Sequence, residues 1–477
     1  MACLLVAGAA GALERSESDS DRVSRRAATL EERVNQAMGL LASQVVQLEI
    51  VAEPATAFTV VVPVSGELLT LDMRPYSTRS DQYQLVIQHP DGSQESVQPG
   101  PERTLRGTVR EIDGATVAGS LLEDGLLARI TLPDGEEYWV EPLAPRLRGA
   151  SREQYAVYRG ADVIQGRGVC GAAEAAQYQQ RRGDVQPSAA AACGGQFCLA
   201  ELGIAADVEY FEDYGSVAAV EARVASVIGV MNEQYERDVE ITHTIKQVIV
   251  HTAEPDPYSA TNPNTLLNQL VSEWQANNQG IGYDIAELFT GKNIDGGVIG
   301  IAFLNAVCGS NRYSVVQSDF NNNFSCTTDL SAHELGHNWG ASHCTCSGWT
   351  MNPSITCANQ FHANFTIPSI VSFRDSRSCL DPTGGCLVPA DCDDGNPCTD
   401  EDCVAQICQF TNNTNLCDDA DACTENDACG GGTCAGTPLV CDDFDACTTD
   451  TCAGGICQFD PINCDDGNVC TDDACVA

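Results

Sequence analysis

The segment 333–343, HELGHNWGASH, constrains the fold of this chain more than any other feature of its sequence. Residues four apart lie on one face of a helix, so His333 and His337 can present their imidazoles to a single ion. Gly340 allows the backbone to turn sharply out of the helix, and this turn brings His343 round as a third ligand. The pattern therefore predicts a helix that runs through His337, a tight turn, and a metal centre held by both.

Glu334 follows the first histidine, so it lies beside the metal without binding it. Three neutral imidazoles leave a fourth tetrahedral position for water, which is typical of a catalytic zinc site. Zinc lowers the pKa of such a water and polarises a carbonyl, and Glu334 is placed to take the proton and pass it on. Only seven histidines occur in the chain and three lie in this segment, which disfavours a surface helix with incidental histidines. A folded zinc site that has lost its activity stays an alternative.

Charge and cysteine are distributed unevenly along the 477 residues. The net charge is −42, and residues 386–477 hold 16 of the 26 cysteines, 20 acidic residues and no Lys or Arg. Such a field repels nucleic acid and anionic lipid, so neither is expected as a partner. The cysteine density indicates disulfides formed in an oxidising compartment, and we expect a secreted, extracellular protein.

The first residues, MACLLVAGAAGALE, look like the apolar part of a signal peptide whose basic start is missing. We therefore expect residues 1–20 to be a truncated signal segment, with a frayed apolar end as the alternative. No run reaches 18 consecutive apolar residues, so no transmembrane anchor is expected.

Residues 21–192 are predicted to form a β-rich domain. Helical spacing over 21–45 gives way to short alternating runs, which are broken by turn signals at 89–92 (HPDG) and 132–135 (LPDG). The link at 179–195 is polar, then Ala-rich, and its Arg181-Arg182 pair is a candidate processing site.

Residues 193–385 alternate between strand-like and helix-like segments, which predicts an α/β (α+β) domain around the histidine segment. We expect a helix over 217–236 and a strand over 241–252. A substrate strand is expected to add to the edge strand that precedes the histidine helix.

Residues 386–477 contain four copies of one cysteine pattern, roughly C-x5-C-x4-C-x4-C, and the fourth stops after its third cysteine, so we expect it to be incomplete. Apolar residues are too few for a core, so disulfides must hold each copy. The Asp pairs after each first cysteine either bind calcium, which prefers oxygen ligands, or are merely solvated. The copies begin at Cys392, Cys417, Cys441 and Cys464.

Eight residues past His343 stands Met351, in GWTMNP. Together with 283–308 (YDIAELFTGKNIDGGVIGIAFLNAVC) and 372–380 (SFRDSRSCL), the histidine segment resembles the adamalysin/reprolysin branch of the metzincin zinc metalloproteases. The resemblance implies a metzincin catalytic domain with a mixed twisted sheet and an active-site helix, in which Met351 packs beneath the zinc.

The same resemblance implies a disulfide between Cys308 and Cys379, with Cys344, Cys346 and Cys357 cross-linked nearby. Cys344 itself departs from the family pattern, which usually has Asp directly after the third histidine. The family often binds a structural calcium far from the zinc, and the matching positions here are Glu201, Asp284 and the backbone of Cys379, assisted by Asp381. Ordinary solvated carboxylates are the alternative.

The amino-terminal half resembles a reprolysin propeptide, chiefly over 103–143, and GRGVCGAA with Cys170 follows. In the family an unpaired propeptide cysteine occupies the open zinc position as a thiolate and keeps the zymogen silent. The alternative for Cys170 is a disulfide with Cys193 or Cys198. The tail is similar to slime-mould-type cysteine repeats, for which spacer, adhesion and substrate-capture roles are all open.

We therefore predict a secreted zinc endopeptidase that is made as a zymogen and hydrolyses internal peptide bonds of protein substrates. The alternative is a non-catalytic extracellular adhesion or matrix protein with a zinc-stabilised domain and repeats that bind calcium or extracellular surfaces. The intact Glu334 favours the enzyme, because a scaffold has no need of that carboxylate. An astacin-like branch is disfavoured, since no Glu follows His343.

Overall fold

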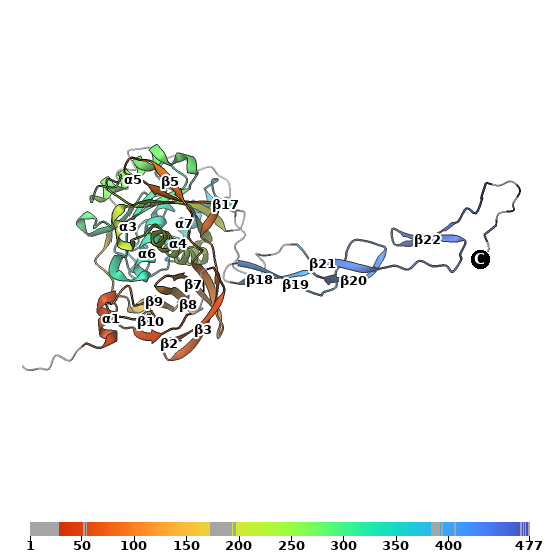
Figure 1. The fold of residues 1–477 in the computed structure, drawn as a ribbon, viewed down its shortest axis with the longest axis horizontal. Coiled ribbons are helices and arrows are strands. Elements are labelled where there is room, and N and C mark those ends of the chain that lie inside the picture. Colours follow the sequence, from red (N-terminus) through yellow and green to blue (C-terminus); the bar gives the residue numbers. More distant parts are fainter. Residues whose placement is uncertain are drawn as a thin grey trace, which may run out of the picture.

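The computed structural model describes residues 28–50, 53, 55–171, 193, 197–382, 392, 395–404, 407–467, 470, 472, 474 and 475. It shows two sheets stacked in one body and a long arm that projects from it (Figure 1). The expected signal segment and the Arg181-Arg182 pair lie outside the described residues.

The first sheet is antiparallel throughout and is built from the N-terminal region, residues 28–171. Helix α1 (Leu30–Met38), capped by Thr29, is shorter than the expected 21–45, and β1 begins soon after it. The strand order is β1-β10-β9-β8-β7-β6-β3-β2. The strands are β1 (Gln44–Gln47), β2 (Phe58–Val64), β3 (Glu67–Pro75), β6 (Thr104–Val109), β7 (Ile112–Leu122), β8 (Gly125–Thr131), β9 (Glu137–Pro142) and β10 (Gln154–Arg159).

The two faces of this sheet pack into two different hydrophobic cores. Successive residues of a strand point to opposite faces of the sheet. Val117 and Tyr138 lie in a core that belongs to the N-terminal sheet alone, whereas their neighbours Ala118 and Trp139 lie in a core that extends into the following region. The N-terminal sheet is therefore buried on both faces.

The second sheet is mixed and has the order β11-β15-β16-β14-β12-β13-β4-β5, with β17 paired to β12. Three of its strands, β4, β5 and β11, come from the N-terminal region. The turn predicted at 89–92 joins β4 to β5, and β4 pairs parallel with β13. Segments on both sides of the boundary expected at residue 192 thus share one sheet. The strands are β4 (Arg79–Gln88), β5 (Gln94–Val97), β11 (Val169–Cys170), β12 (Cys198–Ala206), β13 (Ile241–His251), β14 (Ile285–Thr290), β15 (Val298–Ala302), β16 (Tyr313–Gln317) and β17 (Asp381–Pro382).

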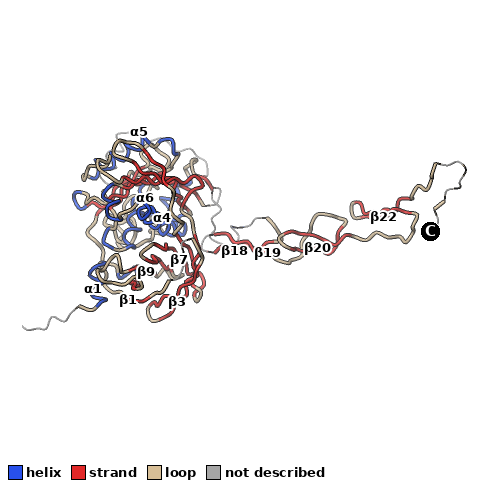
Figure 2. The backbone as a smooth tube through the Cα atoms, in the orientation of Figure 1, coloured by secondary structure: helices blue, strands red, loops and turns tan. Residues whose placement is uncertain are grey.

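Helix α4 (Val217–Val239) lies between the two sheets, against β13 on one side and against β6, β7 and β8 on the other (Figure 2). Helix α3 (Val208–Tyr214) follows β12 and begins at Asp207, whose side chain caps it. The other helices are α5 (Pro263–Asn277), α6 (Phe324–Asn338) and α7 (Thr366–Asp375), with short 3-10 turns at Gly160–Asp162, Gln279–Ile281, Asp295–Gly297 and Phe320–Asn322.

A test of helix length and hydropathy within the described residues finds no single helix able to cross a membrane. Only α3 and α4 taken together, bent by 97° at their junction, pass it.

Over its described residues the arm forms three two-stranded hairpins joined by disulfides. In the second and third copies the first cysteine pairs with the fourth, and between successive copies the second cysteine pairs with the third of the next. Most of its large apolar side chains are exposed, as expected for a unit without a core. The hairpins are β18 (Thr399–Val404) with β19 (Ile407–Asn412), β20 (Thr424–Gly430) with β21 (Thr433–Pro438), and β22 (Thr448–Ala453) with β23 (Ile456–Pro461).

Candidate active site

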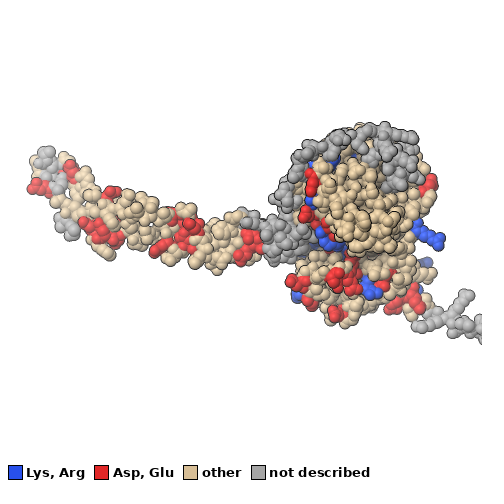
Figure 3. Space-filling view, turned by 180° about the vertical axis from the view of Figure 1, so that it is seen from behind, with Lys and Arg blue, Asp and Glu red and all other residues tan. Residues whose placement is uncertain are grey.

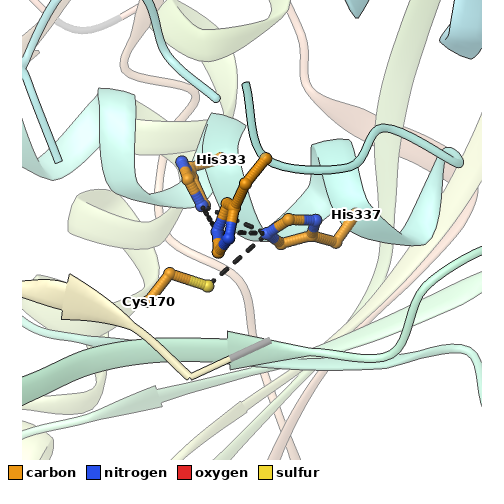
Figure 4. Close-up of side chains that lie close together, drawn as sticks. Cys170, His333 and His337 are labelled. Carbon is orange, nitrogen blue, oxygen red and sulfur yellow. Dashed lines mark hydrogen bonds between the residues drawn. The ribbon is translucent and has the colours of Figure 1, made fainter. Parts of the chain in front are cut away.

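Helix α6 presents the first two histidines. Asn323 caps the helix by accepting a hydrogen bond from the backbone N–H of Cys326, and every residue of α6 is buried. The Nε2 atoms of His333 and His337 lie 3.2 Å apart at its C-terminal end (Figure 4). His343 completes the group, with its Nε2 at 3.2 Å from His333 and 3.1 Å from His337.

The third histidine returns to the helix through a turn that needs glycine. Gly340 has a φ of 91°, which lies in the left-handed region. A Cβ at this position would come within 2.9 Å of the Asn305 side chain and 3.0 Å of Phe373. Any larger residue at position 340 would therefore strain the turn and displace His343.

The three imidazoles fit a tetrahedral zinc ion. With Zn–N bonds of about 2.0–2.1 Å, ideal tetrahedral angles place two nitrogens about 3.3–3.4 Å apart, close to the separations observed. The Nδ1 atoms face carbonyl oxygens, at 2.5 Å between His333 and Thr350 and 2.7 Å between His337 and Ala341. Burial lowers the pKa of His333 to about 3, so the ring is neutral and its Nε2 lone pair points to the centre.

Glu334 is buried beside this centre. Its Oε1 atom has no hydrogen-bond partner among the residues that the structure describes, and burial raises its pKa. Gly300 on β15 makes room for this carboxylate, since a Cβ there would collide with Oε1. A buried carboxylate oxygen without a partner fits a position that water or substrate would occupy.

Cys170 reaches the same centre from the N-terminal region. Its Sγ lies 3.5 Å from Nε2 of His337 and 3.4 Å from Oε2 of Glu334, and Figure 4 shows it facing the rings. A tetrahedral zinc ion with a Zn–S bond of about 2.3 Å would place sulfur about 3.5–3.6 Å from each nitrogen. Cys170 and the three histidines form one group of potential metal ligands. The alternative disulfide is not formed, because Cys193 and Cys198 are joined to each other.

The segment around Cys170 lies as a strand between β15 and the loop that contains Pro353 and Ile355. Gly171 donates from its N–H to the carbonyl of Gly300, at 2.9 Å, and β11 runs parallel to β15. On the side of this loop, the backbone N–H of Cys170 donates to the carbonyl of Pro353, at 3.0 Å, and the N–H of Ile355 donates to the carbonyl of Gly168, at 3.3 Å.

Two glycines allow this segment, hereafter the plug (residues 164–171), to lie close to the body. A Cβ at Gly166 would collide with the ring of Phe320, and one at Gly168 would collide with Phe320 and Ile299. This requirement was not among the sequence-based predictions, although the spacing of glycines in GRGVCG is a visible signal of it.

Met351 packs against the histidine helix. It is fully buried, and a Cβ at Gly336 would come within 2.6 Å of its Sδ. The analysis missed Thr350, whose carbonyl orients His333 and whose hydroxyl donates to Asp329 at 2.6 Å. Asp329 precedes His333 by one helical turn, so only helical spacing could have pointed to it.

The residues predicted for calcium are brought together in part. The carboxylate of Asp284 lies near the Cys308–Cys379 disulfide and accepts from the N–H of Glu201 at 2.9 Å. Glu201 directs its own carboxylate to Lys246, at 2.6 Å. Burial, followed by the charge of Glu201, raises the pKa of Asp284 to about 6. Calcium at this place stays a prediction.

The remaining cysteines near the site do not all pair with one another. Cys344 pairs with Cys346, while Cys357 pairs with Cys326 on α6, a partner that the sequence analysis did not name. This second disulfide ties the loop after Met351 to the active-site helix.

Residues 200–370 match the sequence profile of metallo-peptidase family M12, of reprolysin type. The matched range contains the three histidines, Glu334 and Met351, and it supports a protease domain of the metzincin kind. Among solved structures, one titled "Structure of a chaperone-substrate complex" overlaps 38% of this chain and 34% of that chain, at 15% identity and a TM-score of 0.30. The chain thus spans about a third of that protein, and the similarity is too low to bear on the fold.

Proposed function

We propose that this chain is a secreted zinc-dependent endopeptidase that is made as a latent zymogen. The observation that carries the proposal is the convergence of three imidazole Nε2 atoms, 3.1–3.2 Å apart, with the Glu334 carboxylate beside them. The family match over residues 200–370 supports the reaction class. Disulfides in both the body and the arm support an extracellular location.

In the proposed reaction, His333, His337 and His343 hold the metal, and carbonyl groups of Thr350 and Ala341 fix two of the rings. Bound zinc supplies a Lewis acid for the scissile carbonyl and lowers the pKa of its water. Glu334 takes a proton from the attacking water and delivers it to the amine nitrogen as the C–N bond breaks, so the carboxylate is regenerated. Its buried, unpartnered Oε1 atom supports this role.

The substrate in this proposal is an extended protein segment that replaces the plug. The backbone groups of Gly300, Pro353 and Ile355, which now bind residues 168–171, are the ones that would bind the substrate strand. Residues after Met351 would then form one wall of the pocket next to the cleaved bond. Latency follows from Cys170, because its sulfur lies where the fourth ligand of the metal belongs.

The test compares the full chain with two variants after the link at 172–192 has been cut. Glu334→Gln should keep one zinc per chain yet lose about 10²–10⁴-fold of kcat on a fluorescent casein substrate. Glu212→Gln, at an exposed carboxylate on α3, is the matched control and should keep both its zinc and its kcat. The proposal is wrong if the cut wild-type chain carries zinc but cleaves no protein, or if Glu334→Gln is as active as the control.

A further inference from the structure

One face of α4 is buried against the N-terminal region, residues 28–171. Glu221, Gly229, Glu233 and Glu236 follow one another at helical spacing, and the sequence alone would assign such a face to solvent. In the structure the three glutamates are at most 3% exposed. Gly229 allows close approach, since a Cβ there would lie 3.1 Å from a methyl group of Thr104 on β6.

Each of the three glutamates meets an arginine from the N-terminal region. Arg79 lies 2.7 Å from Glu221, Arg129 lies 2.7 Å from Glu233, and Arg106 lies 3.1 Å from Glu236. The side chains of Arg129 and Arg106 are 0% and 1% exposed. Ion pairs buried this deeply lose much when one partner is removed, because the other charge is left unpaired.

Further polar contacts fix the alignment of sheet and helix. Arg106 also donates to the carbonyl of Gly229 at 2.5 Å, and the hydroxyl of Thr116 donates to Glu233 at 3.0 Å. These directional bonds allow only one register of the sheet on α4.

Backbone pairing joins the same two regions. Strand β13 pairs with β12 on one side and with β4 on the other, with register pairs from Gln247–Gln84 to His251–Gln88. Without β4 and β5, β13 would become an edge strand with its backbone N–H and C=O groups unpaired. Long apolar edge strands of this kind are sites of aggregation.

The third link is apolar. Trp139 of β9 packs edge-on against Phe324, the first residue of α6, with ring centroids 6.0 Å apart. Glu141 of β9 accepts a hydrogen bond from the backbone N–H of Phe324 at 2.8 Å. The core that contains Trp139 and Tyr158 also contains the buried side chains of α4 and α6. An interface that resembles a protein core is typical of permanent association.

The plug has far fewer contacts with the body. It is held by the three backbone hydrogen bonds described above, by a hydrogen bond of 2.7 Å from the side chain of Asn321 to the carbonyl of Ile164, by the packing of its glycines against Phe320, and by Cys170. It is also the C-terminal end of the described N-terminal region, so it can leave the cleft without disturbing α4 or β13.

We propose that residues 28–163 are a permanent half of the folded enzyme, bound at the face formed by α4 and β13 after the chain is cut within 172–192. Only the plug then leaves the cleft. The inference deepens the proposed function, since it states how the zymogen would be regulated, but the association itself does not depend on catalysis.

The test uses the full chain with a specific protease site inserted at residues 181–182. After cutting, the two fragments should co-elute in size-exclusion chromatography without denaturant, and urea should separate them. Peptide-level mass spectrometry should show that alkylation of Cys170 rises at least about tenfold while co-elution persists. Separate elution of the N-terminal fragment under native conditions overturns the inference. Co-elution without protease activity would instead leave the inference standing and count against the proposed function.

A pair of variants tests the part played by the buried arginines. Arg129→Ala should weaken association of the cut fragments by about a hundredfold or more, because buried Glu233 loses its ion-pair partner. Arg110→Ala is the control, since Arg110 is exposed and pairs with Asp72 inside the N-terminal sheet. Equal dissociation constants for the two variants contradict the role given to the ion pairs. If Arg129→Ala fails to fold, the cut wild-type chain still decides the question.

Discussion

The region that matches the metallo-peptidase family is flanked by two regions that associate with it in opposite ways. The N-terminal region shares a core with it, adds strands β4, β5 and β11 to its sheet and buries arginines against its glutamates. The repeat arm leaves the body after β17 and is held by disulfides among its own cysteines. Figure 3 shows the contrast, since acidic residues line the arm and basic ones lie only on the body.

Charge accounts for much of this difference. Residues 193–385 hold 7 basic and 21 acidic residues, so a partner must bring positive charge. The first 192 residues hold 18 basic and 26 acidic residues, so they are net negative too, but three of their arginines pair individually with glutamates of α4, whereas the arm holds no Lys or Arg that could do so. The comparison teaches that a region rich in arginine can become part of a neighbouring domain while an acidic one stays apart.

Truncation should give the largest effect on this comparison. A chain that ends at residue 385 should keep its cooperative unfolding transition, with Tm changed by less than about 3 °C. A chain that begins at residue 197 should show no cooperative transition, because β13 loses β4 and α4 loses its cover. Circular dichroism melting of both chains measures this. Equal melting curves would show that the N-terminal region is as separable as the arm.

The next largest difference between the two flanking regions should appear when their disulfides are reduced. Each native disulfide contributes about 2–4 kcal/mol, and the arm has no core to replace that contribution. Under a reductant we expect rapid proteolysis within residues 395–475 while residues 28–171 stay protected. Limited proteolysis read by mass spectrometry gives the order of cleavage, and early cleavage in the N-terminal sheet would contradict the account.

A smaller change is aimed at the plug. Gly168→Ala introduces a Cβ that collides with Ile299 and Phe320, so the plug should lift and the uncut chain should gain activity about tenfold. Gly280→Ala is the matched control, because nothing lies within 4 Å of that position. Initial rates on a fluorescent peptide check the prediction, and equal rates for the two variants would show that the glycine is not required.

The weakest expected effect is a dependence on pH. Burial alone would raise the pKa of Glu233, but the charges of Arg129, Arg237 and Arg106 outweigh it and lower the pKa to about 2. A carboxyl with a lowered pKa stabilises the folded state above its unfolded pKa, about 4.3, and this stabilisation is lost as pH falls towards 2.

Glu137, which also contacts Arg129, acts in the opposite sense, because burial raises its pKa. Because only the wild type loses the stabilising charge of Glu233 as pH falls, its unfolding free energy should decrease more steeply with falling pH than that of Glu233→Gln. Urea titration of the uncut chains between pH 6 and 3 measures both. If the unfolding free energy changes with pH equally in both chains, Glu233 does not contribute to the pH dependence.

The sequence predicted the centre of the site far better than its surroundings. The histidine helix and the turn at Gly340 follow from local spacing, which helix geometry fixes, whereas Met351 was expected only from the family resemblance. The Cys326–Cys357 disulfide and the role of Thr350 did not follow, because they join segments through the tertiary fold. A disulfide pairing depends on which cysteines meet in space, and spacing along the chain does not decide that.

The fold was predictable only within each region. The alternation of β4 is the same whichever sheet it joins, so the sequence could not show that it leaves its neighbours to pair with β13. The polar face of α4 likewise fits water or an arginine-bearing partner equally well. Both choices are made by the packing of distant segments.

The central claim is that the intact chain holds one zinc ion through three imidazoles and the sulfur of Cys170. X-ray absorption at the zinc edge of the uncut chain tests it directly. We predict about three nitrogens at roughly 2.0–2.1 Å and one sulfur at about 2.3 Å, with the sulfur lost in Cys170→Ser. Purified protein without zinc, a site of four sulfurs, or a spectrum that Cys170→Ser leaves unchanged would contradict the account.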